Sequence, residues 1–174
     1  MDPLTELLNR ERKHVLLPKD GEPYTIADVA RKLDELRVKY ILTGWWSFVL
    51  RDLTTEEPWV VWFFNDRFNH DEPLSRNFVA SLFRVPRELL TFGYERMMVY
   101  GYRVRVARIS RAVLDIAYIN CRVGDPEKHA PFIAGFLRCC RRNHVYRYID
   151  RYPPYVKKAI DAAYKLIDQL KQRP

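Results

Sequence analysis

The chain has 174 residues, of which 48% are hydrophobic and 14% aromatic, so a wholly disordered protein is excluded and one folded domain is expected. Thirty Lys and Arg against 22 Asp and Glu give a net charge of +8. No apolar run reaches the roughly 18 residues that a membrane-spanning helix needs, and the polar N-terminus does not have the pattern of a secretory signal. We therefore expect a cytoplasmic protein with no membrane partner. The many charged residues and the scarcity of Gln are typical of a thermophile.

The cysteines and histidines form no metal-binding pattern. The three cysteines are Cys121, Cys139 and Cys140, and the four histidines are His14, His70, His129 and His144. Because no Cys-x-x-Cys pair and no closely spaced histidines occur, we expect buried apolar cysteines and no zinc site. Residues 63–73 carry Asp66, His70, Asp71 and Glu72, but their turn composition favours a solvated loop. The sequence predicts no metal ion and no cofactor.

The first elements follow from capping and periodicity. Residues 2–14 are expected to form a short helix and residues 15–17 a short strand, ended by the turn cluster PKDGEP. Thr25 with Asp28 three residues later is the pattern of a helix N-terminus. Apolar residues fall on one face of the helix that follows, namely Ile26, Val29, Ala30, Leu33 and Leu36.

The next segments alternate between strand and helix. Residues 40–42 predict a strand that runs through Thr43-Gly44 into a short helix over residues 45–52. After the turn TTEEP, residues 59–64 (WVVWFF) are apolar on both faces, which is typical of a buried strand. We interpret Ser75 as the cap of a helix that extends to Phe83, followed by another helical turn in PRELLTFG.

The second half predicts a hairpin and then only helices. Residues 96–109 are expected to form two strands folded at Tyr100-Gly101. Ser110 is the expected cap of the first helix, and Asp125 before a proline starts the second. Helices are expected over residues 111–123, 127–143, 144–152 and 153–174.

These elements predict an α/β (α+β) fold, in which a small mixed sheet is flanked by helices and the C-terminal third is all helical. We expect residues 1–109 to form the α/β core. Residues 110–174 are expected to form a helical part packed on that core within one structural domain.

The order of the central elements resembles a known family. The strand YILTG, the helix WWSFVL, the turn with TTEE and the strand WVVWFF resemble the core of the minimal nucleotidyltransferases of the polymerase-beta-like superfamily, which include antitoxin and AbiEii-type members. The run from YGYRVRVARIS to GFLR is similar to the closing part of that family. The resemblance covers roughly residues 25–151, and it implies a nucleotidyltransferase-like fold.

The catalytic pattern of that family is not kept here. The family's strand ends in Gly-Gly, and two carboxylates on the next strand, usually with a third nearby, hold Mg²⁺. Here Gly44 matches the first glycine, Trp45 replaces the second, and Ser47 follows in the helix. Glu57, or Glu56, falls near the first carboxylate, and Trp59 stands where the second belongs. The resemblance therefore implies a vestigial nucleotide turn with no catalytic residue. The tryptophans are expected to pack in the core or an interface, and the alternative is that they stack on bases.

The positive charge lies in the second half of the chain. Up to residue 87 there are 13 Lys and Arg against 14 Asp and Glu, and from residue 88 onward there are 17 against 8. Arginines interleaved with tyrosines are typical of nucleic-acid surfaces, because arginine binds phosphates and aromatic rings stack on bases. The predicted contact residues are Arg103, Arg105, Arg108, Arg111, Arg138, Arg141, Arg142, Arg147, Arg151, Tyr146 and Tyr148. The alternative is a solvated, salt-bridged surface.

Three functions remain open from the sequence. The first is a non-catalytic nucleic-acid-binding protein, with RNA favoured over DNA because no helix-turn-helix or zinc finger is visible. The second is a structural or assembly subunit of a ribonucleoprotein, defence complex or virus particle, which would bury its aromatic residues against a protein partner or a second copy. The aromatic residues considered for that role are Phe63, Phe64, Phe68 and Tyr155. The third is an active nucleotidyltransferase with displaced carboxylates at Glu57, Asp66 and Asp115, although Asp115 lies mid-helix and is expected to pair with an arginine.

Overall fold

The structure is a computed structural model that describes residues 25–75 and 78–172. The helix expected over residues 2–14 and the strand expected over residues 15–17 lie outside the described residues. None of the described helices is both long and apolar enough to cross a membrane.

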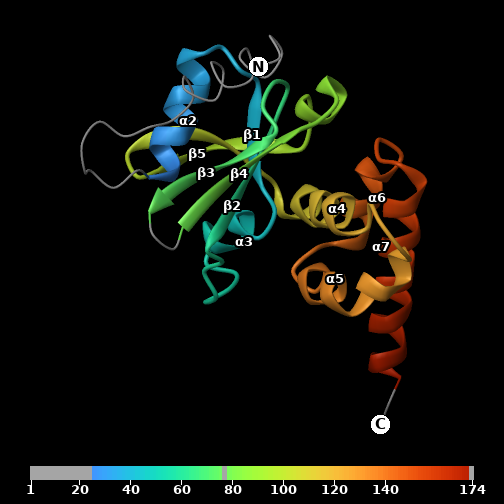
Figure 1. The fold of residues 1–174 in the computed structure, drawn as a ribbon. Helices are drawn as coiled ribbons and strands as arrows, with labels where there is room; N and C mark the ends of the chain where they lie inside the picture. The colour runs from blue at the N-terminus through green and yellow to red at the C-terminus, as the bar shows by residue number, and fades with distance from the viewer. Residues whose placement is uncertain (1–24, 76–77, 173–174) are drawn as a thin grey trace.

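A six-stranded mixed sheet forms the centre of the fold (Figure 1). Its strands are Tyr40–Thr43 (β1), Val60–Asn65 (β2), His70–Ser75 (β3), Phe78–Arg84 (β4), Tyr94–Val99 (β5) and Tyr102–Ala107 (β6). The order across the sheet is β3-β4-β2-β1-β6-β5. β1 runs antiparallel to β2 and parallel to β6, whereas β2 and β4 are parallel. The predicted α/β class with a mixed sheet is confirmed.

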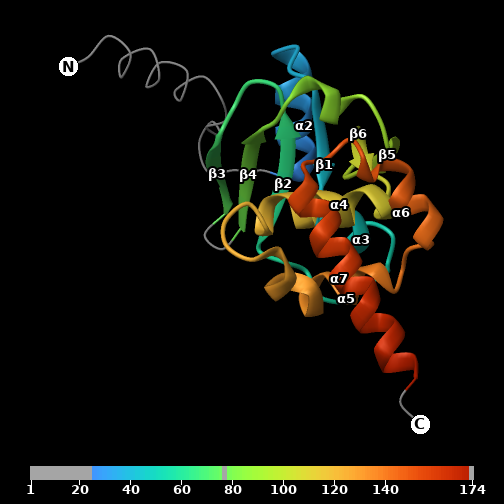
Figure 2. The same ribbon diagram turned by 90° about the vertical axis from the view of Figure 1, so that its right-hand side faces the viewer.

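Helices cover both faces of the sheet and fill the C-terminal part (Figures 1 and 2). The α-helices are Ile26–Glu35 (α2), Trp46–Val49 (α3), Ile109–Asn120 (α4), Ala130–Leu137 (α5), Arg142–Ile149 (α6) and Pro154–Lys171 (α7). The described residues also form two 3₁₀ helices, Arg87–Leu90 (η1) and Pro126–His129 (η2). α2 lies on one face, and α4 with the helices packed around it lies on the other.

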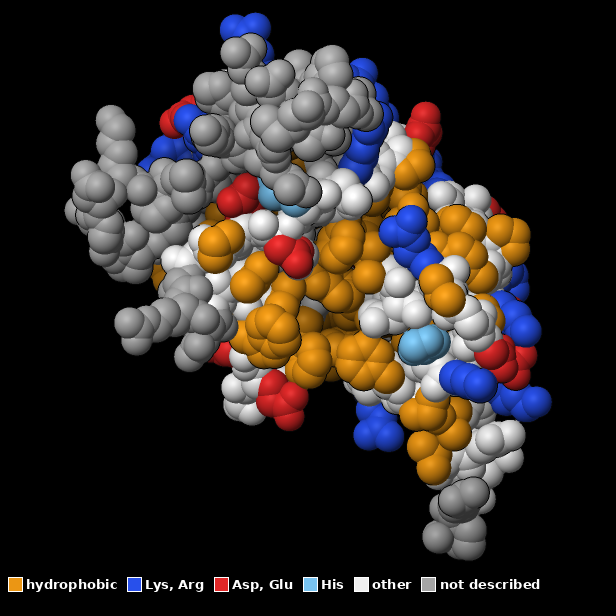
Figure 3. Space-filling model, in the orientation of Figure 1, with side chains coloured by type: hydrophobic (Ala, Val, Ile, Leu, Met, Phe, Trp, Pro, Cys, Tyr) orange, Lys and Arg blue, Asp and Glu red, His pale blue; other side chains and the backbone are white. Residues whose placement is uncertain are grey.

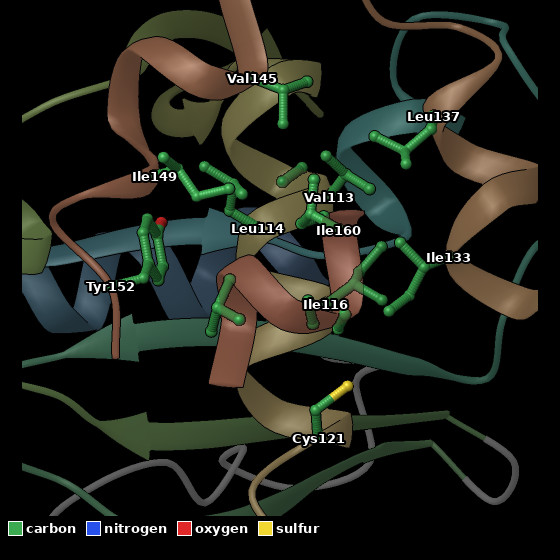
Figure 4. Packing of buried hydrophobic residues seen from close by; sticks show 14 of the residues in the cluster. Val113, Leu114, Ile116, Cys121, Ile133, Leu137, Val145, Ile149, Tyr152 and Ile160 are labelled. Carbon is green, nitrogen blue, oxygen red and sulfur yellow. The ribbon is translucent and has the colours of Figure 1, made fainter. Parts of the chain in front are cut away.

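Two hydrophobic clusters hold these layers together. The larger joins Ile41 and Phe64 of the sheet to α4, α5, α6 and α7. Figure 4 shows its centre, where Val113 and Ile116 of α4 meet Ile160 of α7. The second cluster packs α2 against the other face of the sheet. The larger cluster therefore links the sheet to the C-terminal helices.

Several local predictions are confirmed. Thr25 caps α2 and forms a capping box with Asp28, whose carboxylate accepts a hydrogen bond of 2.8 Å from the Thr25 N–H. The hairpin of β5 and β6 turns at Tyr100 and Gly101, both with positive φ. Asp125 caps η2. These signals are local, so the sequence alone carries them.

The helix expected from Ser75 to Phe83 is wrong, because this segment forms β4. Its residues pair with all of β2, from Val60 opposite Val79 to Asn65 opposite Arg84. The solvated loop expected over residues 63–73 is also wrong, since β3 begins at His70 and pairs antiparallel with β4. In both places pairing between distant strands overrides the local sequence signal.

Two helix boundaries also differ from expectation. α4 begins at Ile109 with Arg108 as its N-cap, so Ser110 is a buried helical residue rather than the cap. The single helix expected over residues 127–143 is divided into η2, α5 and the start of α6, with a break between Leu137 and Arg142. This break becomes part of the site described below.

Candidate nucleic-acid interface

The turn that resembles a phosphate-binding loop follows β1 at Gly44. Gly44 has a φ of +71°, and a Cβ atom built on it would lie 2.6 Å from Cε3 of Trp62. A glycine is needed here because the backbone is left-handed and because the Trp62 ring occupies the space beside it. The close approach that a phosphate requires is therefore taken by an indole ring.

Aromatic side chains line the small cavity next to this turn. Its volume is about 110 Å³, and Trp45, Trp62, Phe132 and Phe136 are four of its eight lining residues. The ring of Trp45 meets the ring of Phe136 edge to face, with centroids 5.3 Å apart. An apolar wall of this kind disfavours a phosphate, because burying an unpaired charge is costly. The tryptophan that replaces the second glycine thus packs against α5.

The vestigial turn residues do not form a metal site. Ser47 is fully buried in α3, while Glu57 is exposed in the loop before β2. The six residues of β2 lie between Glu57 and Asp66, and a strand of this length spans about 20 Å. Asp66 accepts a hydrogen bond from the Lys39 N–H and pairs with Arg87. Across residues 25–75 and 78–172, no three His, Cys, Asp or Glu side chains are grouped for a metal ion.

Asp115 and Arg111 form a buried ion pair instead of contributing to a site. Arg111 Nε lies 3.1 Å from Asp115 Oδ2, and both side chains are fully buried. Thr43 and Tyr152 donate their hydroxyls to the same carboxylate at 2.5 and 2.6 Å. The expectation that Asp115 pairs with an arginine is confirmed. Arg111, predicted as a nucleic-acid contact, is buried and cannot reach a ligand at the surface.

The two predicted tyrosines are also used for packing. Tyr146 stacks on Tyr164 and donates its hydroxyl to Asp161. Burial, with the Asp161 carboxylate, raises the pKa of Tyr146 to about 12. Tyr148 is half-buried, with its ring 5.1 Å from that of Phe92. Neither ring is an open platform for a base.

Three of the predicted arginines are paired with carboxylates. Arg105 bonds to Asp34 of α2 at 3.3 Å, and Arg142 bonds to Asp168 of α7 at 3.2 Å. Arg108 lies 4.0 Å from Glu95. The pairs of Arg108 and Arg142 are exposed and leave the arginine accessible but partly neutralised, whereas Arg105 is half-buried.

The other five predicted arginines are exposed and have no carboxylate within 4.0 Å in the part of the chain that the structure describes. They are Arg103, Arg138, Arg141, Arg147 and Arg151. Four of them lie on α6 or within a few residues of its ends. We call Arg138, Arg141, Arg147 and Arg151 the α6 basic surface. Arg103 lies apart from them, on β6.

A groove adjoins the α6 basic surface at the non-helical segment that connects α5 and α6. Its volume is about 620 Å³, and it runs between this break and the C-terminal half of α7. Arg138, Arg142 and Lys171 bring three positive charges to its wall, against the single carboxylate of Asp168. The guanidinium of Arg142 lies 4.2 Å above the ring of Tyr164, which fixes its position. We call this the α5–α7 groove.

Two basic residues that lie beside predicted contact residues, Lys171 and Arg96, were missed by sequence reasoning. Lys171 stands three residues after Asp168 on α7, so helical spacing alone places both on the same face. Arg96 lies directly opposite Arg105 in the hairpin, a pairing that follows from counting back from Tyr100-Gly101. Both could have been found once the elements were assigned.

Hydrophobic side chains gather on another face. Figure 3 shows a band of them across the middle of the molecule, between the sheet and the helical part. Trp59 is 69% exposed and Phe132 is 44% exposed. The aromatic residues expected at a partner surface are elsewhere: Phe63, Phe64 and Phe68 are buried, and Tyr155 is half-buried with its hydroxyl bonded to Tyr118. Cys139 is exposed, whereas Cys121 is buried, so the cysteine prediction fails at Cys139.

Comparison of the chain with protein-family models and with curated proteins finds no match.

Proposed function

We propose that this protein is a non-catalytic nucleic-acid-binding protein that prefers RNA to DNA and binds through the α6 basic surface. The observation that carries the proposal is the lack of carboxylate partners within 4.0 Å, among the described residues, for Arg138, Arg141, Arg147 and Arg151. A surface that used its arginines for ion pairs would place acids beside them. Residues 138–172 instead contain nine Lys and Arg against three Asp.

The exposed guanidinium groups of the α6 basic surface favour contact with the phosphate backbone of a nucleic acid. Each guanidinium offers a planar fork of donors that matches phosphate oxygens. The tyrosines predicted to stack on bases are occupied by Tyr164, Asp161 and Phe92. Contacts of this kind fit a double helix or a folded RNA, whose bases are not open for stacking. RNA is preferred over DNA because the sequence shows no helix-turn-helix or zinc finger. The α5–α7 groove, beside Arg138, supplies the concave part of the contact.

On this proposal β1, the Gly44 turn and β2 are the remains of a nucleotidyltransferase-like site. Support comes from the element order and from the Trp62 ring, which fills the approach to Gly44. The scattered positions of Glu57, Asp66 and Asp115 weigh against the alternative of an active transferase with displaced carboxylates. The fold then serves as a scaffold that presents the arginines of the C-terminal helices.

The test is binding to fluorescent duplex RNA, single-stranded RNA and duplex DNA, followed by anisotropy at two salt concentrations. The triple variant Arg138→Ala, Arg141→Ala, Arg147→Ala should bind duplex RNA about tenfold or more weakly than the wild type. A control that removes the same amount of charge is Arg37→Ala, Arg67→Ala, Arg84→Ala, because these arginines are exposed and none belongs to the α6 basic surface or lines the α5–α7 groove. Absence of binding at low salt, or an equal loss in the control, would contradict the proposal.

A second function is favoured by one observation, the exposure of Trp59 and Phe132 near the small aromatic cavity. Large exposed aromatic side chains mark protein interfaces. As an assembly subunit, the protein would bury this face against a partner or a second copy. Sedimentation velocity of the wild type and of Trp59→Ser tests this: an oligomer that is absent in the variant would support it, and a monomer at all concentrations would rule out self-assembly.

A further inference from the structure

We infer that a second site on this protein binds a phosphate group, in a cavity between the β5–β6 hairpin and α2. The cavity has a volume of about 270 Å³ and is lined by Asp34, Arg96, Tyr102, Arg103 and Arg105. The inference goes beyond the proposed function, because α2 lies on the face of the sheet opposite the helices that carry the α6 basic surface.

The arrangement of the three arginines carries the inference. Arg96 on β5 lies directly opposite Arg105 on β6. Arg103 is two residues from Arg105 and therefore shares its side of the strand. Like charges placed opposite each other in a sheet repel and destabilise it. A bound anion would remove this repulsion, whereas within the described residues only Asp34 contributes a carboxylate to the cavity wall.

Asp34 is already used to fix the site. Its carboxylate accepts hydrogen bonds from the hydroxyls of Tyr40 and Tyr102, at 3.1 and 2.9 Å, and from Arg105 at 3.3 Å. The guanidinium of Arg105 also lies 5.2 Å from the centre of the Tyr40 ring. Arg105 is thus held in place before a ligand arrives, which lowers the entropic cost of binding. Arg96 and Arg103 have no ion-pair partner in the described part of the chain.

Charge and size indicate a phosphate. Three guanidinium groups and the Asp34 carboxylate leave a charge of +2 in the cavity. A phosphate monoester carries a charge of about −1.5 to −2 at pH 7 and offers three acceptor oxygens. Arginine forks bind such oxygens in pairs. The phosphate could belong to a free phosphorylated compound or to a phosphorylated end of a nucleic acid.

The first arm of the test uses inorganic phosphate and amide chemical shifts. In the ¹⁵N-labelled full chain, the amide signals of Arg96, Arg103 and Arg105 should shift saturably as phosphate is added at constant ionic strength. The double variant Arg96→Ala, Arg103→Ala should weaken this binding about tenfold or more, since two charged hydrogen-bond donors are removed. Arg84→Ala, which removes an exposed arginine from β4, should leave it unchanged. Absence of saturation up to about 10 mM, the range that fills a millimolar site, would overturn the inference, and so would an equal loss in the control.

The second arm separates the two sources of phosphate and the two proposals. An RNA with a 5′ phosphate that shifts the hairpin signals more than the same RNA with a 5′ hydroxyl points to a nucleic-acid end; equal effects point to a free compound. The triple variant of the α6 basic surface should keep its response to inorganic phosphate even where it no longer binds RNA. Loss of phosphate binding in that variant would overturn the inference of a separate site. A hairpin that binds phosphate in a protein without RNA binding would leave the inference standing and reject the proposed function.

Discussion

Arg111 and Asp115 form an ion pair one helical turn apart on α4, with Nε and Oδ2 separated by 3.1 Å and both side chains fully buried. Burial lowers the pKa of Arg111, but the Asp115 carboxylate and the Tyr152 side chain together raise it above its usual value. The pair connects three parts of the fold, because Asp115 also accepts hydrogen bonds from Thr43 of β1 and from Tyr152 in the turn before α7.

Removing one partner of this pair should be strongly destabilising. Arg111→Met leaves the Asp115 charge buried and unbalanced, and we expect a loss of about 3–5 kcal/mol in the free energy of unfolding, measured by urea denaturation. Arg142→Met breaks the exposed pair with Asp168 and should cost less than about 1 kcal/mol. The double variant Arg111→Met, Asp115→Leu should recover only part of the loss, because it removes the unbalanced charge but leaves the Thr43 and Tyr152 hydroxyls without their acceptor. A cost below that of Arg142→Met would show that Arg111 is not buried as described.

Tyr152 and Tyr164 allow a comparison of how much a buried tyrosine hydroxyl contributes to stability with and without a hydrogen-bond partner. Tyr152→Phe removes a donor to a buried carboxylate and should cost about 1.5–3 kcal/mol. The hydroxyl of Tyr164 is buried without a hydrogen-bond partner among the described residues, so Tyr164→Phe should be neutral or stabilising. Thermal or urea unfolding of the two variants compares them directly. Equal effects would contradict the description of the network around Asp115.

Gly44 should tolerate substitution far less well than Gly101. Both have a positive φ, so alanine costs about 1–2 kcal/mol at either position. At Gly44 the new methyl group would also collide with the Trp62 ring, whereas nothing lies within 4 Å at Gly101. We expect Gly44→Ala to lose about 1–3 kcal/mol more than Gly101→Ala in urea unfolding. A difference near zero would mean that the approach to Gly44 is open, as in a working phosphate turn.

Because of three partly buried tyrosines, we expect the free energy of unfolding to decrease at alkaline pH. Burial raises the pKa values of Tyr146, Tyr155 and Tyr164 to about 12. The pKa of each of these tyrosines is higher in the folded protein than in the unfolded chain, where it is near 10. Their contribution to the free energy of unfolding is therefore complete below pH 10 and is lost as the pH rises towards 12. The free energy of unfolding should therefore decrease as the pH rises from about 10 to about 12. Tyr146→Phe should make this decrease with pH less steep. Tyrosinate absorbance that shows these groups titrating near pH 10 in the folded protein would contradict this.

Much of the fold could be predicted where the signals are local. The Thr25 capping box, the turn at Tyr100-Gly101 and the stripe of α7 are all encoded within a few residues. β4 could not be predicted this way, because a strand in that segment is stabilised by its parallel pairing with β2. A cap-like serine and a few apolar residues gave a stronger local signal for a helix.

The candidate site likewise combines features that the sequence predicts with features that only the tertiary structure reveals. The excess of arginine over acid in the last third is a property of the sequence, and it correctly indicates an exposed basic surface at Arg141, Arg147 and Arg151. Which aromatic and basic residues are exposed depends on tertiary packing. Arg111 and Tyr146 could not be separated from the surface set without knowing that Asp115 and Asp161 face them.

The salt dependence of duplex RNA binding tests the central claim most directly. For the wild type, the logarithm of the association constant should fall steeply and linearly with the logarithm of the salt concentration. For the variant Arg138→Ala, Arg141→Ala, Arg147→Ala, the slope should be smaller by about 2–3, because each phosphate that an arginine no longer neutralises lowers it by about one unit. The same slope in both proteins, or no binding by the wild type at low salt, would contradict a nucleic-acid interface on α6.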